Sequence, residues 1–371
     1  MLTVSQVYTK VLRSGEKVVV DPETTVQRVM LIFYGLINVG AFFPLATTYS
    51  EKYVGYWLAF LEPGIVYFLL PILLWYLNSK LIKHPPTGSV LNKVFKVVKT
   101  GLVQSRGAVW KKDWLDTAKP SALSLRGVTD VAWTDKDVLD IKRTFVACSI
   151  YLYFPIYYIN DGGIGSVATS QGATMTTNGA PNDLLGNFNP LTIIISVPIL
   201  SYGVYPLLRK YNIKFGRISR ITFGFFLAIL SGLFGTLVQW KIYQLSPCGN
   251  QATSCAEVAP INIWWQVPNV AFGALSECFC QVTAYELAYA RAPEGMKAMV
   301  LAIFLFMTAL SSALGEVISP AIKDPHLVWV WAGPTIALVV QTVIFWVRYR
   351  DYNEDEVGSC SLYTRNTATA S

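Results

Sequence analysis

The chain has 371 residues, of which 53% are hydrophobic and only 14% are charged, and its mean hydropathy is +0.41. A soluble domain carries roughly 25% charged residues, so the composition excludes an ordinary soluble protein and predicts an all-α polytopic membrane protein. The formal net charge of +7 does not indicate nucleic-acid binding, because the basic residues lie in alternate loops rather than on one binding face.

We expect about eight transmembrane helices, because eight windows of some 17 or more residues are mostly apolar. They cover residues 29–48, 54–77, 144–160, 190–208, 221–243, 264–290, 296–320 and 327–347. Only Lys52, Lys241 and Lys323 fall on the side opposite the other Lys and Arg residues. This asymmetry and the even number of spans predict that both termini are cytosolic.

The loops divide the chain into five expected parts. Residues 1–28 form a polar cytosolic segment without the apolar core of a signal peptide, and residues 29–77 hold two helices. Residues 78–143 form a basic cytosolic linker, in which the three-residue spacing of Lys93, Lys96 and Lys99 predicts an amphipathic helix at the membrane surface. A six-helix bundle at 144–347 and a cytosolic tail at 348–371 complete the chain.

The first expected helix carries Asn38 with glycines nearby. Its amide either bonds across a packed helix interface, for about 1 kcal/mol, or contacts a substrate, and both interpretations stay open here. In the third helix, tyrosines accompany Pro155. They indicate either an interfacial aromatic belt or a kinked gating element.

Asn189 and Pro190 open the fourth helix, where they fit the N-cap and the first helical position. A second role for Asn189 as a ligand amide is open, because a helix N-terminus attracts carboxylates. A cytosolic anchor is expected after this helix from the basic residues Arg209, Lys210, Lys214, Arg217 and Arg220.

The external loop before the sixth helix carries Cys248 and Cys255, which are seven residues apart on the oxidising side and therefore predict a disulfide. The other four cysteines are expected to be free thiols: Cys148, Cys278, Cys280 and Cys360. The sequence has no metal-ligand spacing, nucleophile triad, P-loop or dinucleotide motif, so we expect neither an enzyme nor a bound cofactor.

The sixth helix holds the most informative residue, Glu277, near the middle of its apolar run. A carboxylate at that depth costs about 2.5–3.5 kcal/mol on insertion scales, so it normally faces a bundle interior or a wet cavity. Gly273, Glu277 and Gln281 share one helical stripe at four-residue spacing. Glu286 points to the opposite face near the helix end, so only Glu277 is expected to form a site. On the seventh helix, Phe304 and Thr308 share a side that could border a pocket.

These residues resemble the proton-coupled oligopeptide transporter family, in particular its fungal peptide-transporter branch. The family signature F-Y-x-x-I-N-x-G-small occurs as FYGLINVGA at residues 33–41. A second match joins Glu277 to APEGMK at 292–297, and a third is PND at 181–183 followed by Asn189 and Pro190.

The resemblance implies a major-facilitator fold and proton-coupled symport of di- and tripeptides across the plasma membrane by a monomer. It implies that Glu277 receives the peptide amino terminus and that Asn38 and Asn189 grip the peptide backbone. It assigns the wall of a side-chain pocket to Phe304, Leu305 and Thr308, with Tyr158 as a further candidate.

By the same resemblance, the eight helices correspond to the fifth through twelfth helices of a twelve-helix family. The fold is then partial, because the first four helices would carry a Glu-x-x-Glu-Arg proton-coupling motif. The family's paired acid on its seventh helix is also missing, since the matching residues 160–163 read NDGG. One expectation is therefore a large part of a longer symporter. The alternative is a truncated membrane protein or gene-model fragment without uptake activity.

Overall fold

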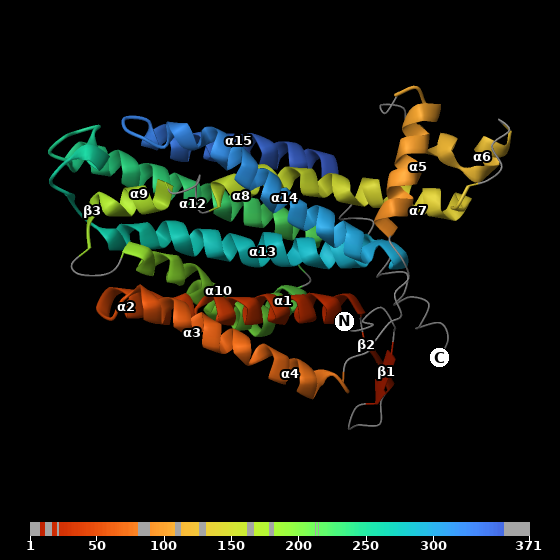
Figure 1. Cartoon of the computed structure of the whole chain (residues 1–371), viewed down its shortest axis with the longest axis horizontal. Helices are drawn as coiled ribbons and strands as arrows, with labels where there is room; N and C mark the ends of the chain where they lie inside the picture. Colours follow the sequence, from red (N-terminus) through yellow and green to blue (C-terminus); the bar gives the residue numbers. More distant parts are fainter. Residues whose placement is uncertain are drawn as a thin grey trace. The chain divides into compact units, whose positions relative to one another are not determined.

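A computed structural model describes residues 8–11, 17–20, 22–80, 90–107, 113–125, 131–161, 167–177, 182–211, 213 and 215–351. Helices dominate these residues (Figure 1), and the predicted all-α membrane class is confirmed. The predicted tail at 348–371 falls almost wholly outside the described residues, as do Cys360 and most of the first 21 residues.

The helices have the following bounds: α1 (Pro22–Ala41), α2 (Pro44–Tyr53), α3 (Tyr56–Phe68), α4 (Leu70–Leu77), α5 (Val90–Gln104), α6 (Pro120–Ser124), α7 (Asp135–Cys148), α8 (Phe154–Asn160), α9 (Val167–Ala173), α10 (Phe188–Pro198), α11 (Tyr205–Lys210), α12 (Arg217–Leu245), α13 (Val267–Arg291), α14 (Lys297–Ile318) and α15 (Leu327–Tyr349). The π-helix η4 (Ile199–Val204) joins α10 to α11. A 3₁₀ turn, η2 (Ser149–Tyr153), joins α7 to α8.

Within the described ranges, six helical stretches are long and apolar enough to cross a membrane. They are Thr25–Tyr53, Tyr56–Leu77, Leu185–Lys210, Arg217–Leu245, Lys297–Ala321 and Leu327–Tyr349. The other two expected spans, 144–160 and 264–290, are also largely helical. They are less apolar, because residues 144–160 include four tyrosines and an asparagine and α13 carries two glutamates among other polar side chains.

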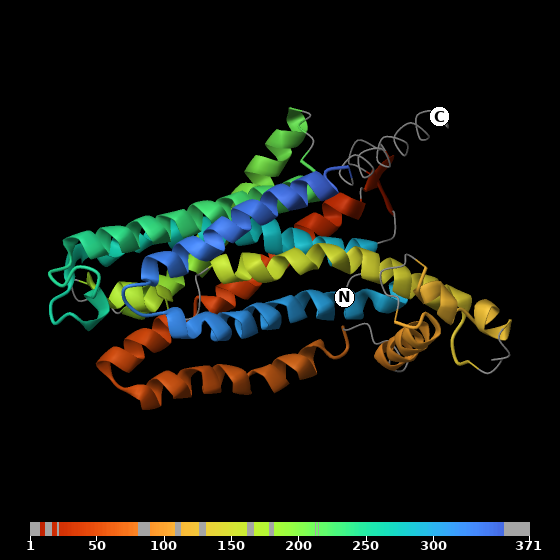
Figure 2. The ribbon, with the colours of Figure 1, turned by 90° about the horizontal axis from the view of Figure 1, so that it is seen from above.

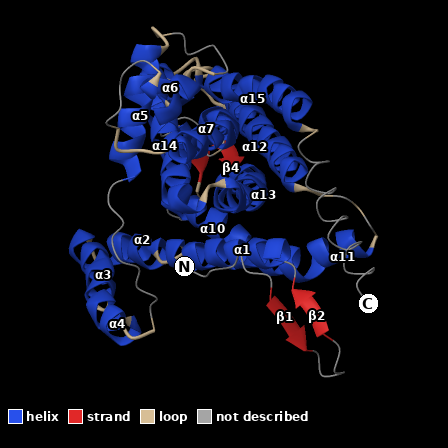
Figure 3. Ribbon diagram, turned by 90° about the vertical axis from the view of Figure 1, so that its right-hand side faces the viewer, coloured by secondary structure: helices blue, strands red, loops and turns tan. Residues whose placement is uncertain are grey.

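Two short strand pairs accompany the helices and were not predicted from the sequence (Figure 3). Strands β1 (Tyr8–Val11) and β2 (Lys17–Val20) form an antiparallel hairpin. Strands β3 (Met175–Thr176) and β4 (Ala259–Asn262) pair in parallel. Over such short segments, the alternation of apolar and polar residues is a much weaker signal than the long apolar windows of the helices.

The chain divides into two compact units, which are described separately here. The first contains Met1–Ile82, Pro155–Glu286 and Leu310–Ser371, and the second contains Lys83–Phe154 and Leu287–Ala309. In the first unit, α12 and α15 lie side by side along their length (Figures 1 and 2). Helix α1 packs against α10 in the same unit.

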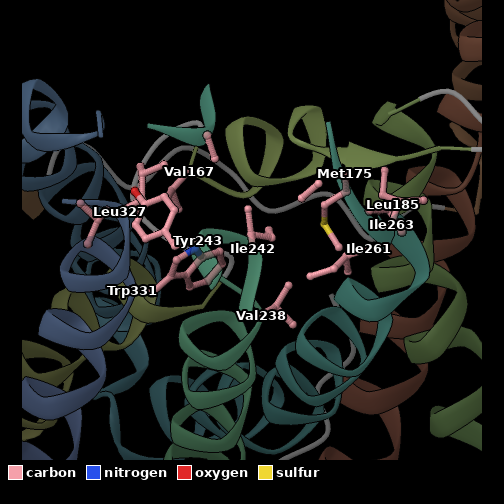
Figure 4. Close-up of a cluster of buried hydrophobic side chains, with 13 residues drawn as sticks. Val167, Met175, Leu185, Val238, Ile242, Tyr243, Ile261, Ile263, Leu327 and Trp331 are labelled. Atoms are coloured by element: carbon pink, nitrogen blue, oxygen red, sulfur yellow. The ribbon is translucent and has the colours of Figure 1, made fainter. Parts of the chain in front are cut away.

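A cluster of buried side chains fixes one end of the first unit (Figure 4). Tyr243 from α12 lies beside Leu327 and Trp331 from α15, while Met175 and Ile261 bring the β3–β4 pair into the same cluster. Helices and strands that are far apart in the sequence therefore share one apolar core at this end, and that core holds the loop between α12 and β4 in place.

The second unit is built on α5, whose apolar side is buried against the η1 turn (Leu115–Ala118) and α7. Val94 and Val97 face this core, while Lys96 and Lys99 are exposed. Beside the core, Asp116 accepts bonds from Lys119 and Lys142. Partial burial raises the pKa of the Asp116 carboxyl, but the two ammonium groups lower that pKa further, so it lies below its usual value.

Close packing at Gly232 gives a prediction about the first unit. A Cβ at this position of α12 would lie 2.1 Å from Thr335 Oγ1 and 2.6 Å from Asn160 Oδ1. The Thr335 hydroxyl also donates to Asn160 Oδ1 at 2.8 Å. We expect Gly232→Ala to destabilise the protein by about 1–3 kcal/mol through overpacking, measured by detergent-induced unfolding.

Gly333→Ala on α15 is the matched control, because a Cβ there meets nothing within 4 Å. Since Ala has the higher helix propensity, the control should be neutral or slightly stabilising. Equal unfolding profiles for both variants would show that the packing at Gly232 is not tight.

Candidate functional site

The stripe of α13 that carries Gly273, Glu277 and Gln281 faces other elements of the first unit along its whole length. Asp161, directly after α8, approaches Gly273. The hydroxyl of Tyr158 on α8 donates to Gln281 Oε1 at 2.5 Å. Glu277 lies between these two contacts, and α1 and α10 supply its partners.

Two neutral donors hold the Glu277 carboxylate. Asn189 Nδ2 donates to its Oε1 at 2.6 Å, and the hydroxyl of Tyr34 donates to its Oε2. Tyr34 is buried, with 7% of its surface exposed, whereas Glu277 is only partly buried. The carboxylate therefore has hydrogen-bond partners, and no Lys, Arg or His of the described residues forms an ion pair with it.

An apolar cluster around these three side chains keeps the geometry rigid. It includes Leu31 on α1, Ile193 on α10, Leu227 on α12 and Cys278 on α13, all buried. Four helices thus bring Glu277, Tyr34 and Asn189 together in surroundings of low polarity. A carboxylate in such surroundings attracts a cation strongly, because water screens its charge poorly.

The structure corrects the capping interpretation of Asn189. Helix α10 begins at Phe188 and its N-cap is Asn187, so Asn189 already lies inside the first turn. Its side chain is directed to Glu277 instead. The Asn-Pro pair therefore lies two positions too late for Asn189 to be the N-cap.

Asn38 and Tyr158 lie near this site in different ways. Asn38 is buried, and its Nδ2 donates to the carbonyl oxygen of Tyr34, one turn earlier on α1. That bond lies within one helix rather than across an interface. Tyr158 reaches Gln281, one turn beyond Glu277 on α13.

The three predicted wall residues lie on the part of α14 that belongs to the second unit. Phe304 is fully buried, and its ring centroid lies 5.1 Å from that of Tyr151 and 5.2 Å from that of Phe154. Leu305 and Thr308 are exposed. In the second unit, Phe304 is a core side chain, and the proposed wall remains a prediction.

A second acidic centre was missed by the sequence analysis. Glu286 is fully buried and pairs with Arg217 (Nε to Oε1, 2.9 Å) and Arg220 (Nη1 to Oε2, 2.7 Å). The two arginines, which were expected in a cytosolic anchor after the fourth helix, are thus buried ion-pair partners of Glu286. Both arginines occupy the first turn of α12 and face α13. Their three-residue spacing places them on one face of the helix, and this spacing is the sequence signal that could have indicated a shared acidic partner.

A disulfide joins Cys248 to Cys255 in the loop after α12, with a Cα–Cα distance of 5.8 Å. Cys148, Cys278 and Cys280 are free and buried. We expect intact mass after alkylation to show two fewer modified thiols before reduction than after it, and about 2–3 kcal/mol of local stabilisation from this short loop. Alkylation of both loop cysteines without reductant would contradict this.

Within the described ranges, no group of three or more His, Cys, Asp or Glu side chains is arranged to hold a metal ion. A carboxylate, amides and tyrosine hydroxyls meet instead at the junction of α1, α8, α10 and α13.

Comparison with known protein families gives a match to the family described as "PTR2: POT family" over residues 19–347. Among curated proteins, the MFS-type transporter ucsM of Acremonium sp. is 65% identical over 95% of this chain and 59% of its own length. The peptide transporter PTR2 of Candida albicans is 43% identical over 91% of this chain and 56% of its own length. The chain thus spans somewhat more than half the length of these relatives.

Solved structures of POT family transporters share the fold. A crystal structure of an auto-inhibited POT family peptide transporter aligns with a TM-score of 0.62 and 18% identity, and it covers 87% of this chain and 70% of that one. The POT family transporter PepTSo aligns with a TM-score of 0.64 and 16% identity at the same coverage. These two similarities establish a common architecture.

Proposed function

The chain belongs to the POT family, and on that basis we propose that it contributes the substrate site of a proton-coupled symporter for di- and tripeptides. The family consists of transporters rather than enzymes, and the described helices make the chain a multi-pass membrane protein. The observation that carries the proposal is the Glu277 carboxylate, held by Tyr34 and Asn189 without a cationic partner among the described residues.

The proposed roles follow from what a short peptide presents. Its terminal ammonium needs a carboxylate, because a buried charge is tolerated only when it is paired and hydrogen-bonded. Glu277 supplies that charge. The amides of Asn189 and Asn38 would bond the peptide backbone, and Tyr158 on α8, which donates to Gln281 one turn beyond Glu277, would be a further contact.

The side-chain wall of Phe304, Leu305 and Thr308 completes the proposal. An apolar and aromatic lining with few polar groups accepts side chains of different shapes, which a transporter of mixed peptides requires. Protons would serve as the coupling ion, and no cofactor is required.

We further propose a monomer in the plasma membrane, with both termini and the 78–143 linker in the cytosol. The exposed lysines of α5 support this topology, because basic segments remain on the cytosolic side and favour anionic lipid.

The proposal is tested by peptide binding to the purified chain in lipid nanodiscs. Labelled dialanine should bind saturably, and unlabelled di- and trialanine should displace it. N-acetyl-dialanine should compete poorly, because it lacks the ammonium that Glu277 would bind. Absence of saturable binding, or equal competition by the acetylated peptide, would overturn the proposed function.

A further inference from the structure

A cavity of about 260 Å³ lies beside the Glu277 site in the first unit. Asn189, whose amide donates to Glu277, lines it, together with Gly273 on α13 and Asp161 after α8. Whole-ligand sites usually measure roughly 300–1,000 Å³. This cavity therefore has the size of a subsite for one side chain.

Asp161 is the one ionisable residue among the cavity-lining residues of the described chain. The hydroxyl of Tyr157 donates to its Oδ2 at 3.3 Å, and the Ser276 hydroxyl donates in turn to Tyr157 at 3.0 Å. Both are neutral donors, and the first bond is long. No Lys, Arg or His in the described part of the chain forms an ion pair with Asp161.

The approach of Asp161 to α13 depends on Gly273. A Cβ at position 273 would lie 2.7 Å from Asp161 Oδ1. Because glycine occupies this position, the Asp161 carboxylate can lie against the backbone of α13. Position 273 is on the same stripe of α13 as Glu277, one turn away. The neighbouring polar groups are already engaged, since Asn269 Nδ2 donates to the backbone oxygen of Ser231 at 2.7 Å and the Ser231 hydroxyl donates to the Asn269 carbonyl oxygen at 2.8 Å.

We propose that Asp161 forms a second cation subsite, which binds the ammonium or guanidinium of a basic ligand side chain in this cavity. A carboxylate with only one neutral donor lacks a compensating charge, and a bound cation would provide it. The inference rests on the proposed function, in which Glu277 takes the amino terminus. It adds a preference for peptides that contain lysine or arginine.

Binding of matched dipeptides to the full chain in nanodiscs tests the subsite. Lys-Ala and Ala-Lys are compared with the same dipeptides in which norleucine, which lacks only the ammonium, replaces lysine. We expect at least one lysine peptide to bind about tenfold tighter than its norleucine partner. Asp161→Asn should reduce this ratio to about one, whereas Glu316→Gln on the exposed end of α14 should leave it near ten. A ratio near one in the wild type, or an unchanged ratio in Asp161→Asn, overturns the subsite.

A second measurement does not depend on peptide binding. Pentylammonium should raise the melting temperature of the Glu277→Gln chain, and pentanol should not, because Asp161 remains available for the amine. If pentylammonium stabilises the wild type but not Glu277→Gln, or stabilises neither chain, the subsite at Asp161 is overturned. If pentylammonium acts through Asp161 while no peptide binds, the subsite stands and the proposed peptide function fails.

Discussion

Glu286→Gln is expected to cost about 3–5 kcal/mol of stability, because it removes the charge that two buried arginines share. Arg220 has 5% of its side chain exposed and Arg217 has 10%, while Glu286 is fully buried. A glutamine keeps the shape but leaves two guanidinium groups without a counter-charge. Detergent-induced unfolding of the purified chain measures the loss.

Glu316→Gln provides the control, because it removes the same charge from an exposed position on α14. Surface substitutions usually change stability by less than about 0.5 kcal/mol. If Glu286→Gln unfolds at the same detergent concentration as this control, the ion pairs of Glu286 with Arg217 and Arg220 do not hold α12 to α13.

Long, strongly apolar segments made the helices predictable. Six of the eight expected spans coincide with stretches that the structure shows to be long and apolar. The strand pair of Met175 and Ala259 could not be predicted, because it joins loops that are far apart in the sequence. Its pairing depends on how the helices bring the two loops together.

The candidate site was predictable only in part, for a physical reason. A mid-membrane carboxylate is costly, so Glu277 could be selected from its position alone. Its partner Tyr34 gave no such signal, since a tyrosine in an apolar helix is common and its hydroxyl finds Glu277 only through tertiary packing. Glu286 was set aside because it points to the opposite face near the helix end, and its arginine partners, 66 and 69 residues away in the sequence, could not be identified without the tertiary packing.

Glu277→Gln is expected to weaken binding of dialanine at least about tenfold, or 1.4 kcal/mol. The substitution keeps the side-chain shape but removes the negative charge that the peptide ammonium requires. Binding of N-acetyl-dialanine should change much less, because it has no ammonium to lose.

Tyr34→Phe separates charge from hydrogen bonding. It removes the hydroxyl that donates to Glu277 but leaves the carboxylate and the Asn189 bond. We expect this variant to retain the preference for a free amino terminus. Loss of that preference in Tyr34→Phe would assign ammonium recognition to the tyrosine hydroxyl instead.

The most direct test of the Glu277 site is a double-mutant cycle between protein and ligand. Four affinities are measured in nanodiscs, for wild type and Glu277→Gln, each with dialanine and with N-acetyl-dialanine. If the ammonium lies on the carboxylate, the two changes should be coupled by at least about 1.4 kcal/mol. Additive losses, with a coupling energy near zero, would contradict Glu277 as the residue that receives the peptide amino terminus.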